Sequence, residues 1–272
     1  MSAVGQCPHV ATFGRLRVEV HDSRQLAGEA AANAAASAIK TAAEDREAFG
    51  VIFATGGSQI ATLEALSRIQ HLPWEKVQGF HMDDYVGLPA GHPASFHAYL
   101  RERLPQRKQM RSFMEINGNA ADLDQMCRNY DAALRAVDPQ VCMLGIGENG
   151  HLAFNDPGEA DFNDPLNIRL VHLDAVCRQQ QAAEGWFKSS DEVPQTAITL
   201  TVPALLRVPK LVISVPGKRK AVIVRRTLQE SISTNCPSTI LRTHADAALY
   251  LDDESASEIQ DLLASARFQT ES

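Results

Sequence analysis

The stretch VIFATGGSQIATLEALS, residues 51–67, joins an apolar run to a helix-forming run through a turn that contains two glycines. Residues Val51–Ala54 are apolar without alternation, which is typical of a strand buried on both faces of a parallel sheet. Gln59–Ser67 is rich in good helix formers. Adjacent glycines allow a sharp turn between the two runs. The stretch therefore predicts a strand–turn–helix unit, from which α/β folds are built.

The same alternation of strand-like and helix-like runs continues in both directions along the chain. It predicts an α/β fold, a doubly wound, mostly parallel sheet with helices on both faces, as a single domain over residues 1–272. The acidic loop-like stretch PGEADFNDP (157–165) opens residues 157–190, a candidate lid. The other predicted strands are Val77–Phe80, Val141–Leu144, Leu211–Val215 and Ala248–Leu251, and the other predicted helices are Ser23–Arg46, Asp122–Ala136, Gly217–Gln229 and Ser255–Phe268.

The composition is that of a globular protein that carries a net negative charge. Of the 272 residues, 44% are hydrophobic and 22% are charged, which predicts a packed core. The formal net charge of −7 argues against nucleic-acid binding, because that function needs a basic face. An anionic ligand would have to be held by local positive groups, since the overall field repels it.

Several features favour a cytoplasmic protein. No run of 18 apolar residues predicts a membrane span, and the N-terminal residues do not have the pattern of a signal peptide. The five cysteines are scattered and form no CxxC pair, which favours a reducing compartment. Cys142 and Cys177 lie in apolar stretches and are expected to be buried thiols. The cysteines are Cys7, Cys127, Cys142, Cys177 and Cys236.

Two turns between a predicted strand and a predicted helix suit a phosphate group. Gly56, Gly57 and Ser58 place a flexible backbone at the start of a helix, whose free N–H groups and positive dipole end attract anions. The alternative is a plain turn that Ser58 caps. The second turn, PGKRK (216–220), has three cations at a helix start, where they oppose the dipole unless an anion compensates them. Its alternative is a solvated basic turn.

Two adjacent carboxylates follow the predicted strand Val77–Phe80. Buried carboxylates are costly, so Asp83 and Asp84 are expected to face a site or solvent, and one of them is a candidate general base. The alternative is a turn with a solvated or capping aspartate. His92 and His97, which flank the start of a further helix, are expected at the surface.

The richest motif is GIGENGHLAFNDPG (145–158), which directly follows the predicted strand Val141–Leu144. In it, His151 has candidate partners in Asn149 and Asp156 that would hold one tautomer of the ring. The motif differs from the dinucleotide fingerprint, because it follows the third strand and no acidic residue ends a following strand about 20 residues on. The sequence also lacks HExxH, metal-spaced His/Cys and GxSxG patterns, so neither a metal nor an organic cofactor is predicted.

Taken in order, these motifs resemble the glucosamine-6-phosphate deaminase family over about residues 30–253. The similar segments are FATGGS (53–58), MDDYVGLPAGHPASFHAYL (82–100) and LGIGENGHLAFNDPG (144–158). The resemblance implies a single doubly wound sheet, no cofactor, and aldose–ketose isomerisation with loss of ammonia from a hexosamine 6-phosphate. The 6-phosphogluconolactonases share the fold and the GxGxxGH core but continue with a TASLFP-like tail. Lactone hydrolysis and non-catalytic sugar-phosphate binding remain as alternatives.

The resemblance also implies roles for single residues. Asp83 falls on the base that moves a proton from C2 to C1, and His151 on the group that assists ring opening. Asn149 and Asp156 stand where the family has residues that support the histidine. The phosphate positions are Gly56, Gly57, Ser58, Arg178 and Lys220. Arg178 is also suited to a bidentate phosphate contact.

Three positions depart from the common family pattern, with Asn149 for aspartate, Asp156 for glutamate and His81 for asparagine. Because Asp156 is one methylene shorter than glutamate, we expect Asp156→Glu to keep or increase activity. The expected partner is an amino-sugar phosphate, with neither nucleic acid nor membrane. The sequence leaves open the hexosamine epimer, homo-oligomerisation and any allosteric effector.

Overall fold

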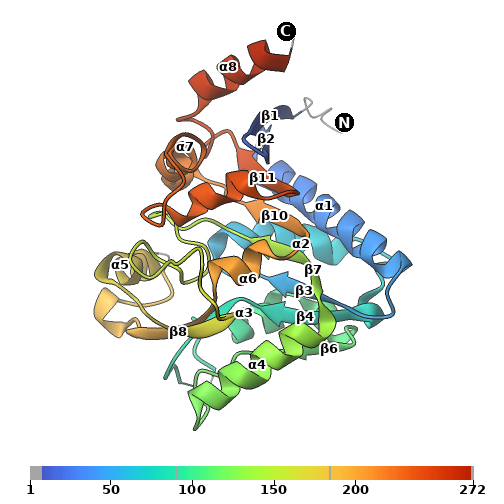
Figure 1. Cartoon of the computed structure of the whole chain (residues 1–272), viewed down its shortest axis with the longest axis vertical. Coiled ribbons are helices and arrows are strands. Elements are labelled where there is room, and N and C mark those ends of the chain that lie inside the picture. Colours follow the sequence, from blue (N-terminus) through green and yellow to red (C-terminus); the bar gives the residue numbers. More distant parts are fainter. Residues whose placement is uncertain (1–7, 90, 184, 271–272) are drawn as a thin grey trace.

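The computed structural model describes residues 8–89, 91–183 and 185–270 of the chain, and an eight-stranded sheet crosses its centre (Figure 1). Neighbouring strands in this sheet are parallel, except that β1 and β2 at one edge form an antiparallel hairpin. All five predicted strands are present, with their ends within two residues of the predicted ones. In sheet order the strands are β1 (His9–Phe13), β2 (Leu16–His21), β11 (Ala247–Asp252), β10 (Lys210–Ser214), β7 (Pro139–Leu144), β3 (Phe49–Phe53), β4 (Val77–His81) and β6 (Ser112–Met114).

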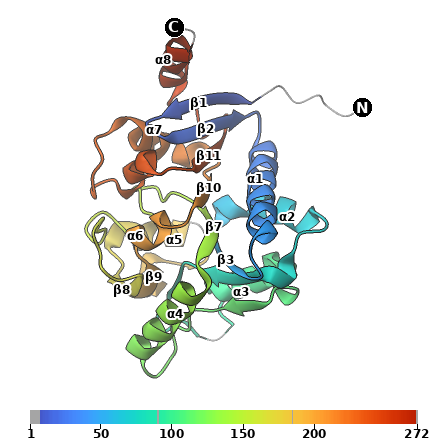
Figure 2. The same cartoon turned by 45° about the vertical axis from the view of Figure 1, so that its right-hand side comes forward.

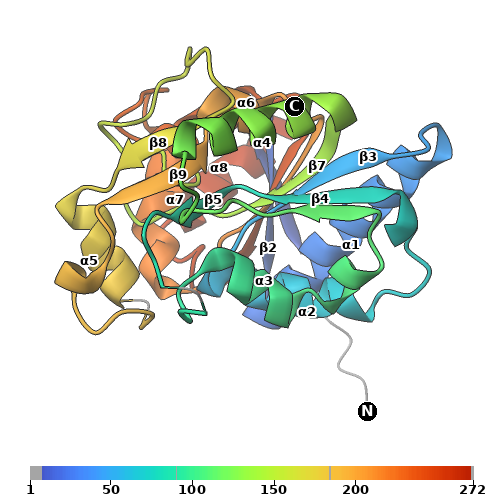
Figure 3. The same ribbon diagram turned by 90° about the horizontal axis from the view of Figure 1, so that it is seen from below.

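Helices cover both faces of this sheet, as Figure 3 shows with the sheet seen nearly on edge. Alternate side chains of one strand point to opposite faces, so Val51 and Phe53 pack in one apolar cluster and Ile52 in another. The first cluster lies under α1 (Arg24–Glu44), α2 (Ile60–Arg68) and α3 (Phe96–Arg103). The second lies under α4 (Leu123–Val137), α6 (Val202–Leu206), α7 (Ala221–Gln229) and α8 (Gln260–Thr270). The predicted doubly wound α/β fold is thus confirmed.

A second sheet of three antiparallel strands was not predicted. It has the order β5 (Asp83–Tyr85), β9 (Thr196–Leu200) and β8 (Ile168–His172). Figure 2 shows β8 and β9 together with α5 (Ala175–Ala183) at the left side of the molecule. Residues 157–190, apart from residue 184, therefore contain a strand and a helix. Their role as a lid stays a prediction.

Short 3₁₀ turns change where several predicted helices begin. Gly57–Gln59 precedes α2 and Lys218–Lys220 precedes α7, so each helix starts one turn after its glycine. The last helix begins at Gln260 instead of Ser255, because the Ser255 N–H donates a hydrogen bond to the Asp252 carboxylate in a turn. The remaining 3₁₀ turns are Trp74–Lys76, Pro105–Lys108, Ser190–Glu192 and Pro237–Thr243.

The two cysteines expected to be buried thiols are buried in the structure. Cys142 and Cys177 are buried, and the four cysteines within the described ranges are free thiols. Cys7 lies outside the described residues. No helix in the part of the chain that the structure describes is long and apolar enough to cross a bilayer.

Candidate active site

A cavity of about 430 Å³ opens at the carboxyl ends of three neighbouring strands, β10, β7 and β3. The loops that follow these strands carry the three motifs Thr55–Ser58, Gly145–His151 and Pro216–Lys220, and all three line the cavity. Sheet order thus brings together segments that are about 90 and 70 residues apart in the sequence. This is where open parallel sheets bind their ligands.

Two of the three loops have nearly the same backbone conformation. Gly56 has φ 88° and ψ 171°, and Gly217 has φ 96° and ψ 150°, both in a region that favours glycine. Each glycine precedes a 3₁₀ turn that runs into a nine-residue helix. The Tyr99 hydroxyl donates to the Gly56 carbonyl at 2.9 Å, and the Gly217 N–H donates to the Asp252 carboxylate at 2.9 Å. Two helix starts, both favourable to anions, therefore flank the end of β7.

His151 is held by a hydrogen-bonded network behind the cavity wall. Its Nδ1 lies 2.8 Å from Oδ1 of Asp156, and Nδ2 of Asn149 donates to the same oxygen at 2.8 Å. The backbone N–H of His151 donates to Oδ1 of Asn149 at 3.0 Å. Because the carboxylate accepts the Nδ1 proton, Nε2 is the ring nitrogen left for a ligand. A Cβ on Gly147 would stand 2.3 Å from the ring, so that position has room only for glycine.

Asp156 is suited to remain ionised beside His151. Burial raises its pKa, but the hydrogen bond and charge of His151 and the hydrogen bond from Asn149 outweigh burial, so the pKa lies below its ordinary value. Although aspartate is shorter than the glutamate common in the family, its carboxylate reaches the histidine ring at the hydrogen-bonding distance of 2.8 Å. Asn149 and Asp156 do not line the cavity, so they can act only through His151.

Asp83 and Asp84 lie in different environments although they are consecutive. Asp84 accepts hydrogen bonds from the N–H groups of Tyr85, Phe96 and His97, and its Oδ2 lies 2.9 Å from Nδ1 of His97. The Asp83 carboxylate lines the cavity and has no hydrogen-bond partner among the described residues. Burial and the neighbouring charge of Asp84 raise the pKa of Asp83 well above its ordinary value. Asp83 is therefore a buried carboxylate of the site that is available to a ligand.

The expectation that both histidines lie at the surface needs a correction for His97. Its side chain is 26% exposed and pairs with Asp84. The two are close because the Asp84 carboxylate accepts the first backbone N–H groups of α3. His92 is also partly buried, because its ring stacks on Phe187 with 5.4 Å between the ring centroids.

The small sheet aligns Asp83 with the His151 loop. Asp83 pairs with Thr199 on β9, and the Thr199 hydroxyl accepts a hydrogen bond from the Phe154 N–H at 3.0 Å. The Asn155 side chain donates to the Leu200 carbonyl at 2.8 Å. The strand that carries Asp83 and the loop that carries His151 are thereby fastened to the same strand.

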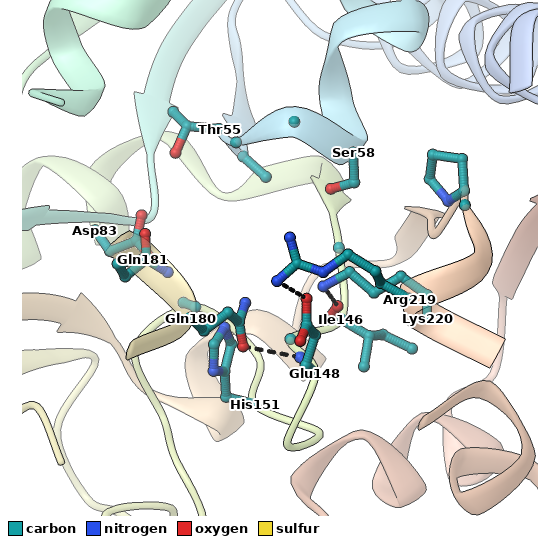
Figure 4. Close-up of a pocket in the computed structure, with 18 of the residues that line it drawn as sticks. Thr55, Ser58, Asp83, Ile146, Glu148, His151, Gln180, Gln181, Arg219 and Lys220 are labelled. Atoms are coloured by element: carbon teal, nitrogen blue, oxygen red, sulfur yellow. Dashed lines mark hydrogen bonds and ion pairs between the residues drawn. The ribbon is translucent and has the colours of Figure 1, made fainter. Parts of the chain in front are cut away.

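Helix α5 supplies two glutamines that sequence reasoning missed. Gln180 accepts from the Glu148 N–H at 3.0 Å, and Gln181 accepts from the Tyr85 hydroxyl at 2.8 Å. Both are buried and line the cavity (Figure 4). No motif marked them, because only the position of α5 over the cavity gives them a role.

One buried cluster has donor atoms close enough for a metal ion. Nitrogen, oxygen and sulfur atoms of His151, Asp156 and Cys177 lie within 4.8 Å of one another. The histidine and the carboxylate are already hydrogen-bonded to each other, and burial raises the pKa of the Cys177 thiol. Both conditions favour a thiol packed against the pair over a thiolate ligand.

The cations of the site are distributed differently from the prediction. Lys220 lines the cavity and its Nζ donates to the Ile146 carbonyl at 2.8 Å. Arg178, predicted at the phosphate, does not line the cavity, and its guanidinium donates to the Ser190 carbonyl at 3.3 Å. Arg178 thus lies outside the cavity lining in this structure, and its contact with a phosphate stays a prediction.

Figure 4 shows that the site has two sides. Asp83 and His151 lie on one side of the opening, and Ser58, Arg219 and Lys220 lie on the other. An ionisable pair and a group of hydroxyl and cationic side chains thus face a common space.

The comparison with known families agrees with this geometry. A family model described as glucosamine-6-phosphate isomerases/6-phosphogluconolactonase matches residues 21–250, which include all three loops. The chain belongs to this family. Glucosamine-6-phosphate deaminase 1 of Bacillus subtilis is 35% identical over 211 residues, which cover 75% of this chain and 85% of that protein. The glucosamine-6-phosphate deaminase of Bacillus cereus (strain B4264) is 33% identical and covers 78% of each chain.

Solved structures from both branches of the family share the fold. A monomeric glucosamine-6-phosphate deaminase superposes with a TM-score of 0.79 at 30% identity, covering 89% of this chain and 99% of that one. The 6-phosphogluconolactonase of Trypanosoma brucei gives a TM-score of 0.73 at 17% identity, covering 91% and 100%. At that identity, the second likeness shows the fold alone.

Proposed function

We propose that this family member isomerises and deaminates a hexosamine 6-phosphate, with glucosamine 6-phosphate as substrate and fructose 6-phosphate and ammonia as products. The observation that carries the proposal is the buried, unpartnered carboxylate of Asp83, which shares a cavity with the oriented imidazole of His151. Identities of 33–35% to proteins named glucosamine-6-phosphate deaminase support the same reaction.

In the first step, Nε2 of His151 exchanges a proton with the sugar ring oxygen, which opens the ring and gives the C1 aldehyde. Asp156 stays ionised and stabilises the imidazolium form that appears during this exchange. Asn149 holds the same carboxylate oxygen and keeps it aimed at Nδ1.

In the second step, Asp83 takes the proton from C2 and returns it to C1. The C1 oxygen gains a proton and the C2 amino group loses one, so that C1 becomes a hydroxymethyl group and the C2–N bond becomes an imine. One water molecule then adds to C2 and ammonia leaves, so that the ketone remains. A raised pKa makes the Asp83 carboxylate a stronger base than an ordinary aspartate, which suits removal of a carbon-bound proton.

The phosphate end of the substrate lies across the cavity from these groups. Gly56, Gly57 and Ser58 offer N–H groups at a helix start, and Lys220 adds a positive charge. Binding the remote phosphate positions C1 and C2 between Asp83 and His151. Residues 157–190 act as a lid in this proposal, because α5 brings Gln180 and Gln181 onto the cavity. We place the protein in the cytoplasm, where free cysteines persist.

The test is a panel of glucosamine 6-phosphate, galactosamine 6-phosphate and 6-phosphogluconolactone, read by release of ammonia and of acid. We expect ammonia from glucosamine 6-phosphate. Acid from the lactone without ammonia would place the protein in the lactonase branch. Binding of the sugar phosphates without turnover would make it a sensor.

A further inference from the structure

One arginine of the cavity has no role in the reaction described above. Arg24 is the first residue of α1, far in sequence from the three loops, yet its side chain lines the cavity. A Cβ built on Gly217 would stand 2.7 Å from Nη2 of Arg24. Arg24 and Ser58 also line a small hollow together. The guanidinium therefore lies where the two glycine turns approach each other.

The other cations that line the cavity already have partners within the protein. Lys220 donates to the Ile146 carbonyl, and Nη2 of Arg219 lies 2.7 Å from the Glu148 carboxylate. Nζ of Lys218 donates to the Ser257 hydroxyl at 2.8 Å. Within the described residues, Arg24 has neither an ion pair nor a hydrogen bond from its side chain, and it is exposed to solvent. Its donors are therefore available to a ligand.

Local structure gives no reason for a cation at this position. Arg24 lies in the first turn of a 21-residue helix, where a positive charge opposes the helix dipole. No acidic residue in that turn compensates it. An anion in the cavity would meet the guanidinium together with the N–H groups at two further helix starts, which turns an unfavourable placement into a favourable one.

We propose that Arg24 binds the substrate phosphate and supplies a bidentate contact of the kind for which Arg178 is suited by its side chain. This inference rests on the proposed function for the identity of the substrate. Two parallel N–H donors of a guanidinium match two phosphate oxygens, which a lysine cannot do. Gly217 contributes by lacking a side chain, because a Cβ there would displace Nη2.

The experiment measures phosphate binding separately from turnover. The dissociation constant for inorganic phosphate is determined by phosphorus NMR titration, and KM and kcat are determined for glucosamine 6-phosphate. The variants are Arg24→Gln, Arg24→Lys and Arg178→Gln. The matched control is Arg46→Gln, which removes the same charge from an exposed position just beyond the other end of α1. Melting temperatures verify that each variant is folded.

We expect Arg24→Gln to weaken phosphate binding and raise KM by about ten- to a hundredfold, the range for hydrogen bonds to a charged group, with kcat within about twofold. The phosphate affinity of Arg24→Lys should lie between those of Arg24→Gln and the wild type. Arg178→Gln and Arg46→Gln should bind phosphate like the wild type. Equal binding by Arg24→Gln and Arg46→Gln, or a tenfold loss confined to Arg178→Gln, overturns the inference. Because the titration needs no turnover, it decides on Arg24 even if ammonia release fails and the proposed reaction is wrong.

Discussion

Oδ1 of Asp156 lies 2.8 Å from Nδ1 of His151, and the same oxygen accepts the Asn149 amide at 2.8 Å. Asp156 is 1% exposed, so the pair sits in a packed environment. A glutamate would add a methylene between a fixed backbone and a contact that is already at full hydrogen-bonding distance. The geometry therefore favours an outcome opposite to the expectation from sequence that Asp156→Glu keeps or increases activity.

We predict that Asp156→Glu lowers kcat/KM for glucosamine 6-phosphate by more than about tenfold, since an extra methylene in a packed core costs about 1–3 kcal/mol. Steady-state kinetics of ammonia release test this. Asp161→Glu is the control, because it makes the same change on an exposed loop of the same segment and should leave the kinetics unchanged. Wild-type activity in Asp156→Glu would mean that the network adjusts to side-chain length.

The environment of Asp83 predicts a stability change with a definite sign. The folded-state pKa of Asp83 is raised, so a protonated Asp83 stabilises the folded state. This contribution to the free energy of unfolding is complete below the unfolded-state pKa of about 3.9. It is lost as pH rises through the folded-state pKa. Asp83→Asn removes this loss. We predict a higher melting temperature than wild type at pH 8, and a difference that shrinks toward pH 4.

The neighbouring residue is the control for that experiment. Asp84 accepts three backbone N–H groups and faces His97, so Asp84→Asn should lower the melting temperature at pH 8. Equal shifts in the two variants would contradict the difference in environment.

The burial of His81 is expected to make the folded state less stable in mild acid. It is fully buried, and burial lowers its pKa to about 4. Its Nε2 accepts the Ile116 N–H at 2.7 Å, which requires the neutral ring. The unfolded chain takes up a proton near pH 6.5, so this contribution is present above that pH and is lost as pH falls toward 4. Its full size is on the order of 3 kcal/mol.

We therefore predict that the free energy of unfolding changes less between pH 7 and pH 4.5 in His81→Asn than in wild type. Urea titrations at both pH values measure it. His172→Asn is the control, since this histidine is exposed on β8 and its replacement should leave the wild-type pH dependence in place. An unchanged slope in His81→Asn would show that another group carries the acid sensitivity.

Lys220 predicts an effect on substrate binding. It lies at the second glycine turn, on the opposite side of the cavity from Asp83 (Figure 4). Lys220→Ala should raise KM for glucosamine 6-phosphate by about tenfold or more while kcat changes little, because the phosphate contact is made in the ground state and the transition state alike. Lys210→Ala, at the start of β10 in an ion pair with Asp246, is the control. An unchanged KM in Lys220→Ala would remove this residue from the phosphate site.

The central part of the fold could be predicted from the sequence because its signals are local. Buried parallel strands such as β3 and β7 are continuous apolar runs, and helix formers follow the glycine turns. The second sheet could not be predicted, since β5 has three residues and pairs with a strand more than 100 residues away. Three residues are too few to show a period.

The same distinction applies to the site. Loops that follow strands could be predicted to converge, because parallel strands end at the same edge of the sheet. Roles that depend on where a helix lies over the cavity could not be predicted, since Gln180 and Gln181 belong to no motif and line the cavity only because α5 lies there. Arg24 carries no motif, and only the packing of α1 beside Gly217 brings it to the cavity.

The central claim is that Asp83 carries the proton between C2 and C1, and ammonia release by Asp83→Asn tests it most directly. The substitution keeps the shape of the side chain and removes its basicity, so kcat should fall by about 10²–10⁴-fold, as is typical of positioned acid–base groups. The dissociation constant for inorganic phosphate should stay at the wild-type value, because the proposed phosphate site lies across the cavity. A folded Asp83→Asn protein that retains more than about a tenth of the wild-type kcat would contradict the claim.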